Sequence, residues 1–238
     1  MDMENNLGYA TPVADESDAV RAQFYKKTYA NLALGVLMFI VFELVLLNTP
    51  VVVNGMMSFI LSGKYSWLIV LGAFMGVTWF AQSLAYNSAS KPKQYAGYAL
   101  YVLAQAFIFV PLLVMAMAQT GDTSLISQAG ILTLALFGGL TGVVFGSNAN
   151  FSFLRSVMII GSFLALGVIV AGMLFGFELG LWFSLAMVGL ASISILYNTW
   201  QIKNEFAADQ YVAAALSLFA SLMLLFWYIL RILMNRNS

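Results

Sequence analysis

The chain has 238 residues, of which 62% are hydrophobic and only 8% are charged, and its formal net charge is zero. Soluble domains carry about 25% charged residues, so this composition excludes an ordinary water-soluble fold. The sequence has neither cysteine nor histidine, which excludes disulfides, Cys/His zinc sites, haem held by these residues and Ser-His catalysis. We expect no cofactor and no metal ion, and the zero net charge gives no indication of nucleic-acid binding.

The first part of the chain, MDMENNLGYATPVADESDAV, is polar and acidic and lacks the apolar core of a signal peptide. We interpret residues 1–25 as a flexible cytosolic tail that becomes a helix near Ala19. The carboxylates of residues 15–18 (DESD) favour a helix N-terminus, where they offset the helix dipole. Residues 26–238 then form a transmembrane domain.

Long uncharged gaps follow this tail. From Glu43 onward, about 20 to 32 uncharged residues separate consecutive charges or charge groups, and each gap holds one apolar run. A helix needs about 20 residues, at a rise of about 1.5 Å each, to cross a bilayer. The spacing predicts an all-α, polytopic membrane protein with seven spanning helices, at about 29–48, 66–86, 95–118, 125–146, 155–176, 179–201 and 210–234.

Other local signals refine this outline. Segment 51–61 is apolar but too short to cross, so we expect an interfacial or re-entrant segment on the outer side. Pro111 falls inside the third span, where it frees a backbone carbonyl and is expected to act as a kink or hinge. Small residues at every fourth position let helix backbones approach closely in lipid. We therefore predict helix-packing faces at Gly138, Gly142, Gly146, Gly72 and Gly76.

The distribution of Lys and Arg predicts the orientation in the membrane. With the N-terminus in the cytoplasm, seven of the ten basic residues lie inside and three lie outside, in agreement with the positive-inside rule. Because the number of spans is odd, the C-terminus is then expected outside.

Ionisable groups within the spans are candidates for function, because their burial in lipid is costly. Glu43 lies about five residues from the outer end of the first span, where it either reaches the interface or serves as a cation or proton site. The last span has no lysine for a retinal Schiff base, and Asp122 and Asp209 lie outside the spans, so no aspartyl protease pair is present. We expect no enzymatic activity.

Neutral polar residues gather on the last two spans. Ser194 and Asn198 share a face of the sixth span, with Tyr197 beside the asparagine, and Ser217 and Ser221 share a face of the seventh. A pair such as Asn198 and Ser221 either joins the two helices as a polar clasp or lines a path for an ion or water.

Several stretches, taken in order along the chain, match a known family. They are KTYANLALG, NSASKPKQYAGYALY, VPLL, NANFSFLRSVMIIG, SILYNTWQI and ADQYVAAALSLFASLMLLFWYILRIL. Over roughly residues 26–234 the chain resembles the Bax inhibitor family, also called the transmembrane Bax inhibitor motif family, whose bacterial branch includes YccA. The resemblance implies a seven-helix bundle with the last helix at its centre, wrapped by the other six.

The resemblance also implies a site. Some members are pH-sensitive calcium leak channels, in which aspartates of helices six and seven share a proton and an arginine of helix two helps hold the closed state. Here the helix-six position is Asn198, the helix-seven position is Ser221, and the second span has no arginine. Because an amide and a hydroxyl do not titrate near neutral pH, the pH-gated pair is lost. Calcium conduction by that mechanism is not expected, since calcium prefers carboxylate-rich sites.

Ser221 and the SKP turn after the second span are similar to YccA-like proteins, which are implied to associate with the membrane protease FtsH and to offer it a cytosolic tail. Our first hypothesis is a YccA-like protein of the bacterial inner membrane that contacts lipid and modulates membrane protein quality control through FtsH-type protease. The alternative is a passive calcium or proton leak channel that lacks the di-aspartyl sensor.

Overall fold

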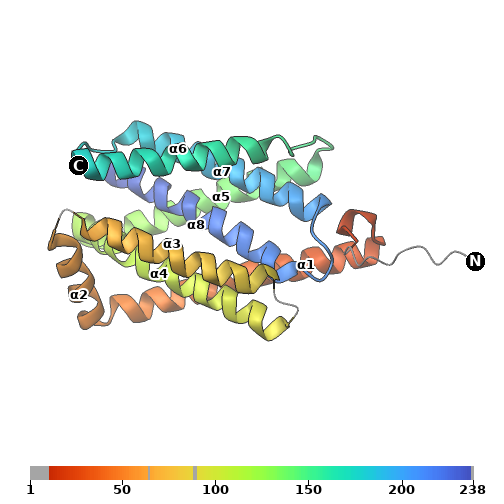
Figure 1. Ribbon diagram of the computed structural model, residues 1–238, viewed down its shortest axis with the longest axis horizontal. Coiled ribbons are helices and arrows are strands. Elements are labelled where there is room, and N and C mark those ends of the chain that lie inside the picture. The colour runs from red at the N-terminus through yellow and green to blue at the C-terminus, as the bar shows by residue number, and fades with distance from the viewer. Residues whose placement is uncertain (1–10, 64, 88–89, 237–238) are drawn as a thin grey trace, which may run out of the picture.

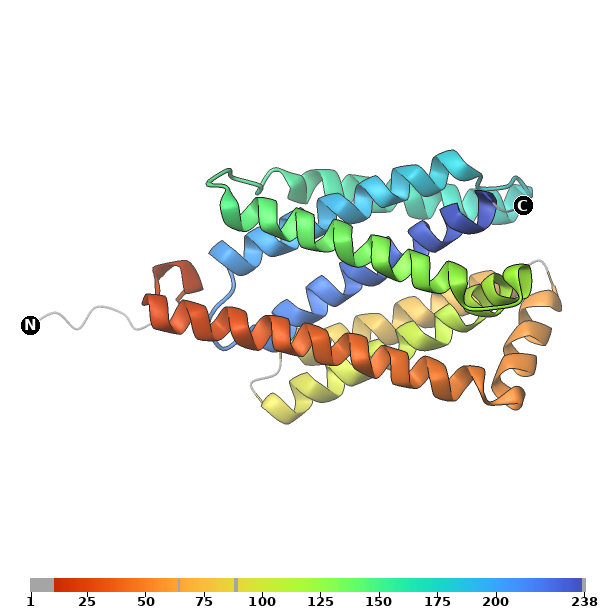
Figure 2. The ribbon, with the colours of Figure 1, turned by 180° about the vertical axis from the view of Figure 1, so that it is seen from behind.

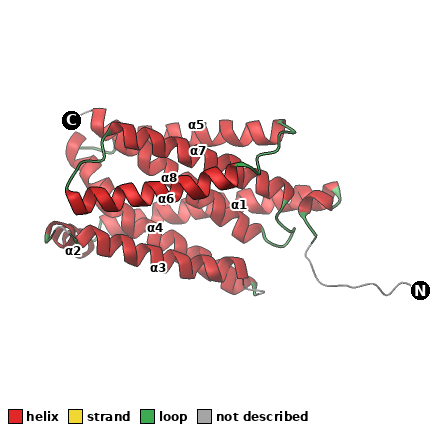
Figure 3. Ribbon diagram, turned by 45° about the horizontal axis from the view of Figure 1, so that its top comes forward, coloured by secondary structure: helices red, strands yellow, loops and turns green. Residues whose placement is uncertain are grey.

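The computed structural model describes residues 11–63, 65–87 and 90–236, and its elements are all helical apart from one isolated β-bridge (Figure 3). Seven helices in these residues are long and apolar enough to cross a membrane. This confirms the predicted fold class. A short 3-10 turn, η1 (Val13–Asp15), precedes the helices α1 (Asp18–Leu47), α2 (Pro50–Leu61), α3 (Ser66–Asn87), α4 (Lys91–Thr120), α5 (Ser124–Gly146), α6 (Leu154–Phe175), α7 (Leu181–Asn204) and α8 (Tyr211–Arg236).

The spanning helices match the predicted spans, but two of them start earlier. α1 begins at Asp18, ahead of the predicted span at residue 29 but close to the helix start expected near Ala19, and α4 begins at Lys91 rather than at residue 95. The added turns carry Lys and Arg residues, so an apolar run does not reveal them. In α4, Ser90 precedes the first helical residue and Pro92 lies in the first turn, where a missing N–H costs no hydrogen bond.

α8 is the centre of the bundle. In its most apolar stretch 72% of the residues are buried, against 6% in α6. Figures 1 and 2, from opposite sides, both show α8 running diagonally between the other helices, and it packs on α1, α3, α4, α5 and α7. Small residues at Ala213, Ser217 and Ser221 allow this close approach, and Phe219 meets Phe39 of α1 edge-on. The central last helix is therefore confirmed, with the difference that five of the six other spanning helices pack extensively on it, while α6 packs on α7.

The predicted glycine packing faces are wrong within this chain. A Cβ atom added at any of the five positions would meet nothing within 4 Å, and all five glycines are exposed: Gly138, Gly142, Gly146, Gly72 and Gly76. The reason is helix rotation, because α5 turns larger side chains such as Phe137 and Val144 toward its neighbours. The glycine stripe consequently faces away from the bundle.

Close helix approach occurs at other glycines. A Cβ at Gly97 of α4 would lie 2.5 Å from the carbonyl oxygen of Ala81 on α3 and 2.9 Å from the backbone nitrogen of Ala85. At Gly35 of α1, a Cβ would overlap the phenol of Tyr98, which donates a hydrogen bond of 3.1 Å to the Asn31 carbonyl. These two glycines set the spacing of α4 against α3 and α1.

α2 is a short apolar helix outside the core. It has twelve residues, about 18 Å at the usual helical rise, and none of them is buried. This is too short for a hydrocarbon layer of about 30 Å, as the sequence indicated for segment 51–61. Pro111 is buried inside α4, and the helix continues past it to Thr120, so the hinge at Pro111 stays a prediction.

From residue 11 onward, the chain that precedes α1 is packed against the bundle and is not a flexible tail. Pro12 forms a β-bridge with Ala207, and the Val13 amide donates a hydrogen bond of 2.8 Å to the Phe206 carbonyl. The Val13 side chain is fully buried. Residues 12–15 therefore strap the N-terminal segment to the loop between α7 and α8, and the expected tail is shortened to residues 1–10, which lie outside the described residues.

Candidate functional site

The polar residues of the sixth and seventh spans come together because α7 and α8 form an antiparallel hairpin. A six-residue loop, 205–210, joins the two helices, and they pack extensively along their length. Ser194 and Asn198 are one turn apart on the face of α7 that meets α8, and Ser217 and Ser221 are one turn apart on the opposing face. We call these four residues the polar clasp.

The clasp is a closed hydrogen-bond network. Asn198 Nδ2 donates a hydrogen bond of 2.7 Å to Ser221 Oγ and another of 3.2 Å to the Ser217 carbonyl. The Ser194 and Ser221 hydroxyls are 2.7 Å apart, and Ser221 Oγ donates 3.0 Å to the Ser217 carbonyl. With its proton on that carbonyl, Ser221 accepts from Asn198 and from Ser194. The Ser217 hydroxyl bonds the Ala214 carbonyl at 2.8 Å.

All four clasp residues are neutral, and three of them are buried, whereas Ser194 is half-buried. Asn198 is 8% exposed and Ser221 is 3% exposed. Neither an amide nor a hydroxyl changes its charge near neutral pH, so a pH step in that range leaves the network unaltered. Within the described residues no three acidic side chains converge as metal ligands. The arrangement joins two helices and provides no acid-base chemistry.

A cavity of about 690 Å³ adjoins the clasp. Its lining combines all four clasp residues with side chains of α3, α4 and α6. Among the added polar groups are Gln82 and Tyr86 of α3 and Gln105 of α4, while the remainder of the wall is largely apolar. The clasp is therefore both a contact between helices and one wall of a cavity.

Two predicted candidates lie elsewhere. Tyr197 is buried on a different face of α7, where its ring stacks on Trp200 at 6.1 Å, and it does not line the cavity. Glu43 is only 5% exposed, so the expectation that it reaches the interface is wrong. The rotation of α1 turns its carboxylate into the bundle, where neither oxygen has a hydrogen-bond partner among the described residues. It does not line the cavity either, so it is separate from any path through the clasp.

Several cavity residues were not among the predicted site residues. Gln82 and Tyr86 are one turn apart on α3, and Gln105 is a buried amide within an apolar helix. An amide inside a spanning helix is a usable signal, because lipid disfavours it without a partner. Arg231, near the end of α8, also lines the cavity.

Comparison with known proteins identifies the family. A family model described as "Inhibitor of apoptosis-promoting Bax1" matches residues 21–238. The chain belongs to the Bax inhibitor family. Protein lifeguard 4 of Mus musculus is 26% identical over 240 residues, which cover 99% of this chain and 94% of the mouse protein. The Golgi anti-apoptotic protein of Vaccinia virus (strain Lister) is 25% identical over 245 residues, which cover 99% of this chain and 95% of the viral protein.

Membership in the Bax inhibitor family gives the clasp its context. The motif resemblance implies aspartates of pH-sensitive relatives at the positions of Asn198 and Ser221. In this family member those two side chains are in direct contact at 2.7 Å. A neutral hydrogen bond thus stands where a pair of carboxylates would share a proton.

Proposed function

We propose that this protein is a modulator of membrane protein quality control in the bacterial inner membrane, which acts through contacts with an FtsH-type protease and has no enzymatic activity. The observation that supports a role other than pH-gated conduction is the Asn198–Ser221 hydrogen bond of 2.7 Å. A contact between two neutral groups gives the bundle no proton-driven switch at this position. The protein then works as a stable helical body that binds partners.

The bacterial branch rests on residues of this chain, since the two relatives named above come from a mouse and a virus. Ser221 and the Ser90-Lys91-Pro92 turn are the traits that resemble YccA-like proteins. The bias of Lys and Arg supports a cytoplasmic N-terminus and an outside C-terminus. In agreement with an odd number of crossings, α1 begins and α8 ends at opposite ends of the bundle (Figure 1).

The strap at Val13 sharpens the expected mode of protease contact. Because Pro12 and Val13 are held against the loop between α7 and α8, residues 1–10, rather than the first twenty, are the segment that we propose is offered to the protease. Co-purification of FtsH from bacterial membranes tests the proposal with the full chain and with a chain that lacks residues 1–10. We expect FtsH to bind the full chain and to be lost or strongly reduced in the truncated one.

A matched control replaces residues 1–10 with a Gly/Ser segment of equal length, which keeps the length of the tail and removes its sequence. Absence of FtsH from the full-chain sample would sink the partner proposal. Equal recovery with the truncated chain would refute the role of the tail while keeping the partner.

The cavity favours a second candidate, a passive cation leak. Asn198 and Ser221 line it together with Gln82 and Gln105, and neutral oxygens are weak ligands for a cation. A leak of this kind would conduct without a response to pH. In liposomes that contain a calcium dye, a steady flux that is lost in Asn198→Leu would support the leak, and a flux at the level of empty liposomes would reject it.

A further inference from the structure

The cavity beside the clasp lies between two helices with little mutual contact. α3 packs on α4 and α8, and α6 packs on α7, whereas extensive packing between α3 and α6 is absent from the described part of the chain. Figure 1 shows α3 and α6 on either side of α8. The 690 Å³ volume is partly open and falls in the usual size range of small-molecule pockets, about 300–1,000 Å³. Both helices are apolar enough to cross a membrane, so an opening between them would face lipid in a bilayer.

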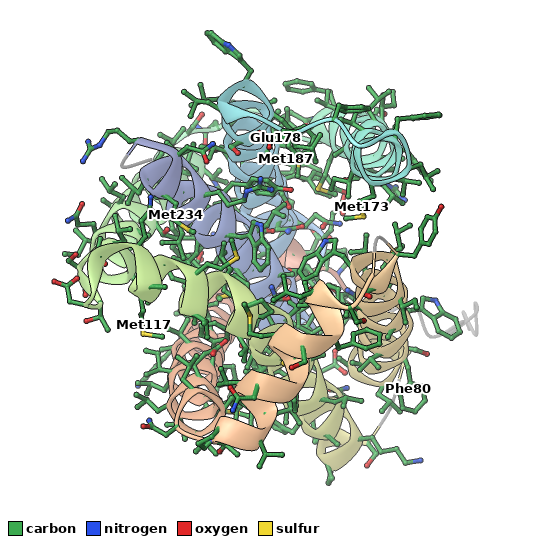
Figure 4. All side chains as sticks on the ribbon, turned by 90° about the vertical axis from the view of Figure 1, so that its left-hand side faces the viewer. Phe80, Met117, Met173, Glu178, Met187 and Met234 are labelled. Atoms are coloured by element: carbon green, nitrogen blue, oxygen red, sulfur yellow. The ribbon has the colours of Figure 1, made fainter. Side chains whose placement is uncertain are left out.

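We call this cavity and its opening between α3 and α6 the groove, and its walls are apolar along most of its length. On α6 the lining residues recur every three or four positions, as one helix face. Figure 4, along the bundle, shows Met173 of α6 between that helix and α3. The apolar lining from the two helices includes Leu71, Phe74, Met75, Met158, Leu166, Ile169 and Met173. Such walls suit a hydrocarbon chain better than a hydrated ion.

One end of the groove carries a cation. Among the described residues of the lining Arg231 is the single charged one, and its guanidinium donates a hydrogen bond of 3.4 Å to the Leu179 carbonyl. Among the described residues it forms no ion pair, since the one salt bridge found there joins Arg21 and Asp18. A guanidinium offers several donors in a fork that matches phosphate oxygens.

Trp227 and Tyr228 lie within one helical turn of Arg231 on α8 and line the same cavity. Trp67 of α3 and Trp227 of α8 stack at 6.4 Å, and Tyr228 also lines the groove. Trp and Tyr concentrate at the level of lipid headgroups. Ser221 lies ten residues before Arg231 on α8, which is about 15 Å along a helix. That distance is half of a hydrocarbon layer of about 30 Å, so the groove extends from the headgroup level to the clasp near mid-membrane.

We propose that this groove binds one anionic phospholipid from the leaflet at the C-terminal end of α8. The lipid phosphate lies on the Arg231 guanidinium, and one acyl chain lies between the apolar faces of α3 and α6 and ends at the polar clasp. The site is independent of the FtsH contact proposed above.

Native mass spectrometry of the purified full-length protein, after equilibration with vesicles of equal phosphatidylglycerol and phosphatidylcholine, tests this site. We expect one retained phosphatidylglycerol per chain. Arg231→Gln should lower its retention about tenfold, the size of one lost charge-assisted contact, while Arg231→Lys keeps most of it. Arg155→Gln, which removes a basic residue outside the groove, is the matched control and should change nothing.

A second pair of variants tests the acyl chain. Ser162 is exposed and lines the groove, so Ser162→Trp fills the groove without disturbing a buried contact. It should reduce retained lipid, and Ser156→Trp, an exposed position on the same helix outside the groove, should not. The proposal would be overturned if the protein retained phosphatidylcholine and phosphatidylglycerol equally, or if Arg231→Gln left the retained phosphatidylglycerol unchanged. It would also be overturned if the two tryptophan variants changed lipid retention equally, or if excess inorganic phosphate displaced the lipid.

Discussion

Asn198 of α7 donates a hydrogen bond of 2.7 Å to the Ser221 hydroxyl of α8, at the two positions where the family resemblance implies aspartates. The contact is buried, and it is reinforced by Ser194 at 2.7 Å from Ser221. A relative with carboxylates at these positions would hold a shared proton there. This chain holds a hydrogen bond between neutral groups, so the contact contains no group that titrates near neutral pH.

Loss of the Asn198 amide should weaken the α7–α8 contact. Asn198→Ala removes donors to Ser221 and to the Ser217 carbonyl, and hydrogen bonds between membrane helices contribute about 0.6 kcal/mol each on average, up to about 1.7. We expect a loss of about 1–2 kcal/mol in the free energy of unfolding, measured by titration with a denaturing detergent. Gln201→Ala, whose amide bonds only the exposed Glu205 carboxylate, is the control and should leave stability unchanged.

Carboxylates at both positions should restore a pH-dependent contact. In Asn198→Asp combined with Ser221→Asp, one shared proton joins the two acids at low pH, and ionisation of both places like charges together at high pH. Stability of the double variant should therefore fall as pH rises, whereas the natural chain shows no such contribution from these residues. Equal pH profiles for the two proteins would show that the two side chains no longer meet.

Gly97 and Gly142 should respond oppositely to alanine. At Gly97 the added methyl group meets backbone atoms of α3, which cannot move aside, so Gly97→Ala should cost about 1–3 kcal/mol. At Gly142 it meets open space, so Gly142→Ala should be neutral or gain up to about 1 kcal/mol from helix propensity. Unfolding titrations of the two variants give the comparison, and a destabilised Gly142→Ala would indicate a contact of the α5 stripe outside this chain.

Glu43→Leu should stabilise the bundle. The carboxylate is buried without a hydrogen-bond partner in the described residues, and an unsatisfied buried polar group costs about 1–3 kcal/mol. The control is Glu178→Gln in the exposed turn between α6 and α7, which should have no effect on thermal unfolding. A less stable Glu43→Leu would mean that Glu43 has a bound partner, such as a cation, in the membrane.

Local features of the sequence were sufficient for the spans. Each spanning helix is an apolar run between charges, which depends only on neighbouring residues. The pairing of Asn198 with Ser221 followed from the family resemblance, and the six-residue loop that places α7 and α8 antiparallel and adjacent is the physical reason that the two side chains meet. Periodicity then gives the face on which each side chain lies.

Features that depend on helix rotation or on distant helices could not be predicted in this way. The spacing of Gly138, Gly142 and Gly146 shows that they share a face, but it does not show whether that face points inward. The burial of Glu43 depends in the same way on the rotation of α1. The cavity needs side chains from five helices, so Arg231 gives no local signal of its place in it.

The central claim is that the neutral Asn198–Ser221 contact leaves this family member without a pH gate. Calcium flux into dye-loaded liposomes, recorded while the pH is stepped from acidic to alkaline, tests it most directly. We predict that the step produces no change in flux. A calcium flux that rises with pH and disappears in Asn198→Ala would contradict the claim.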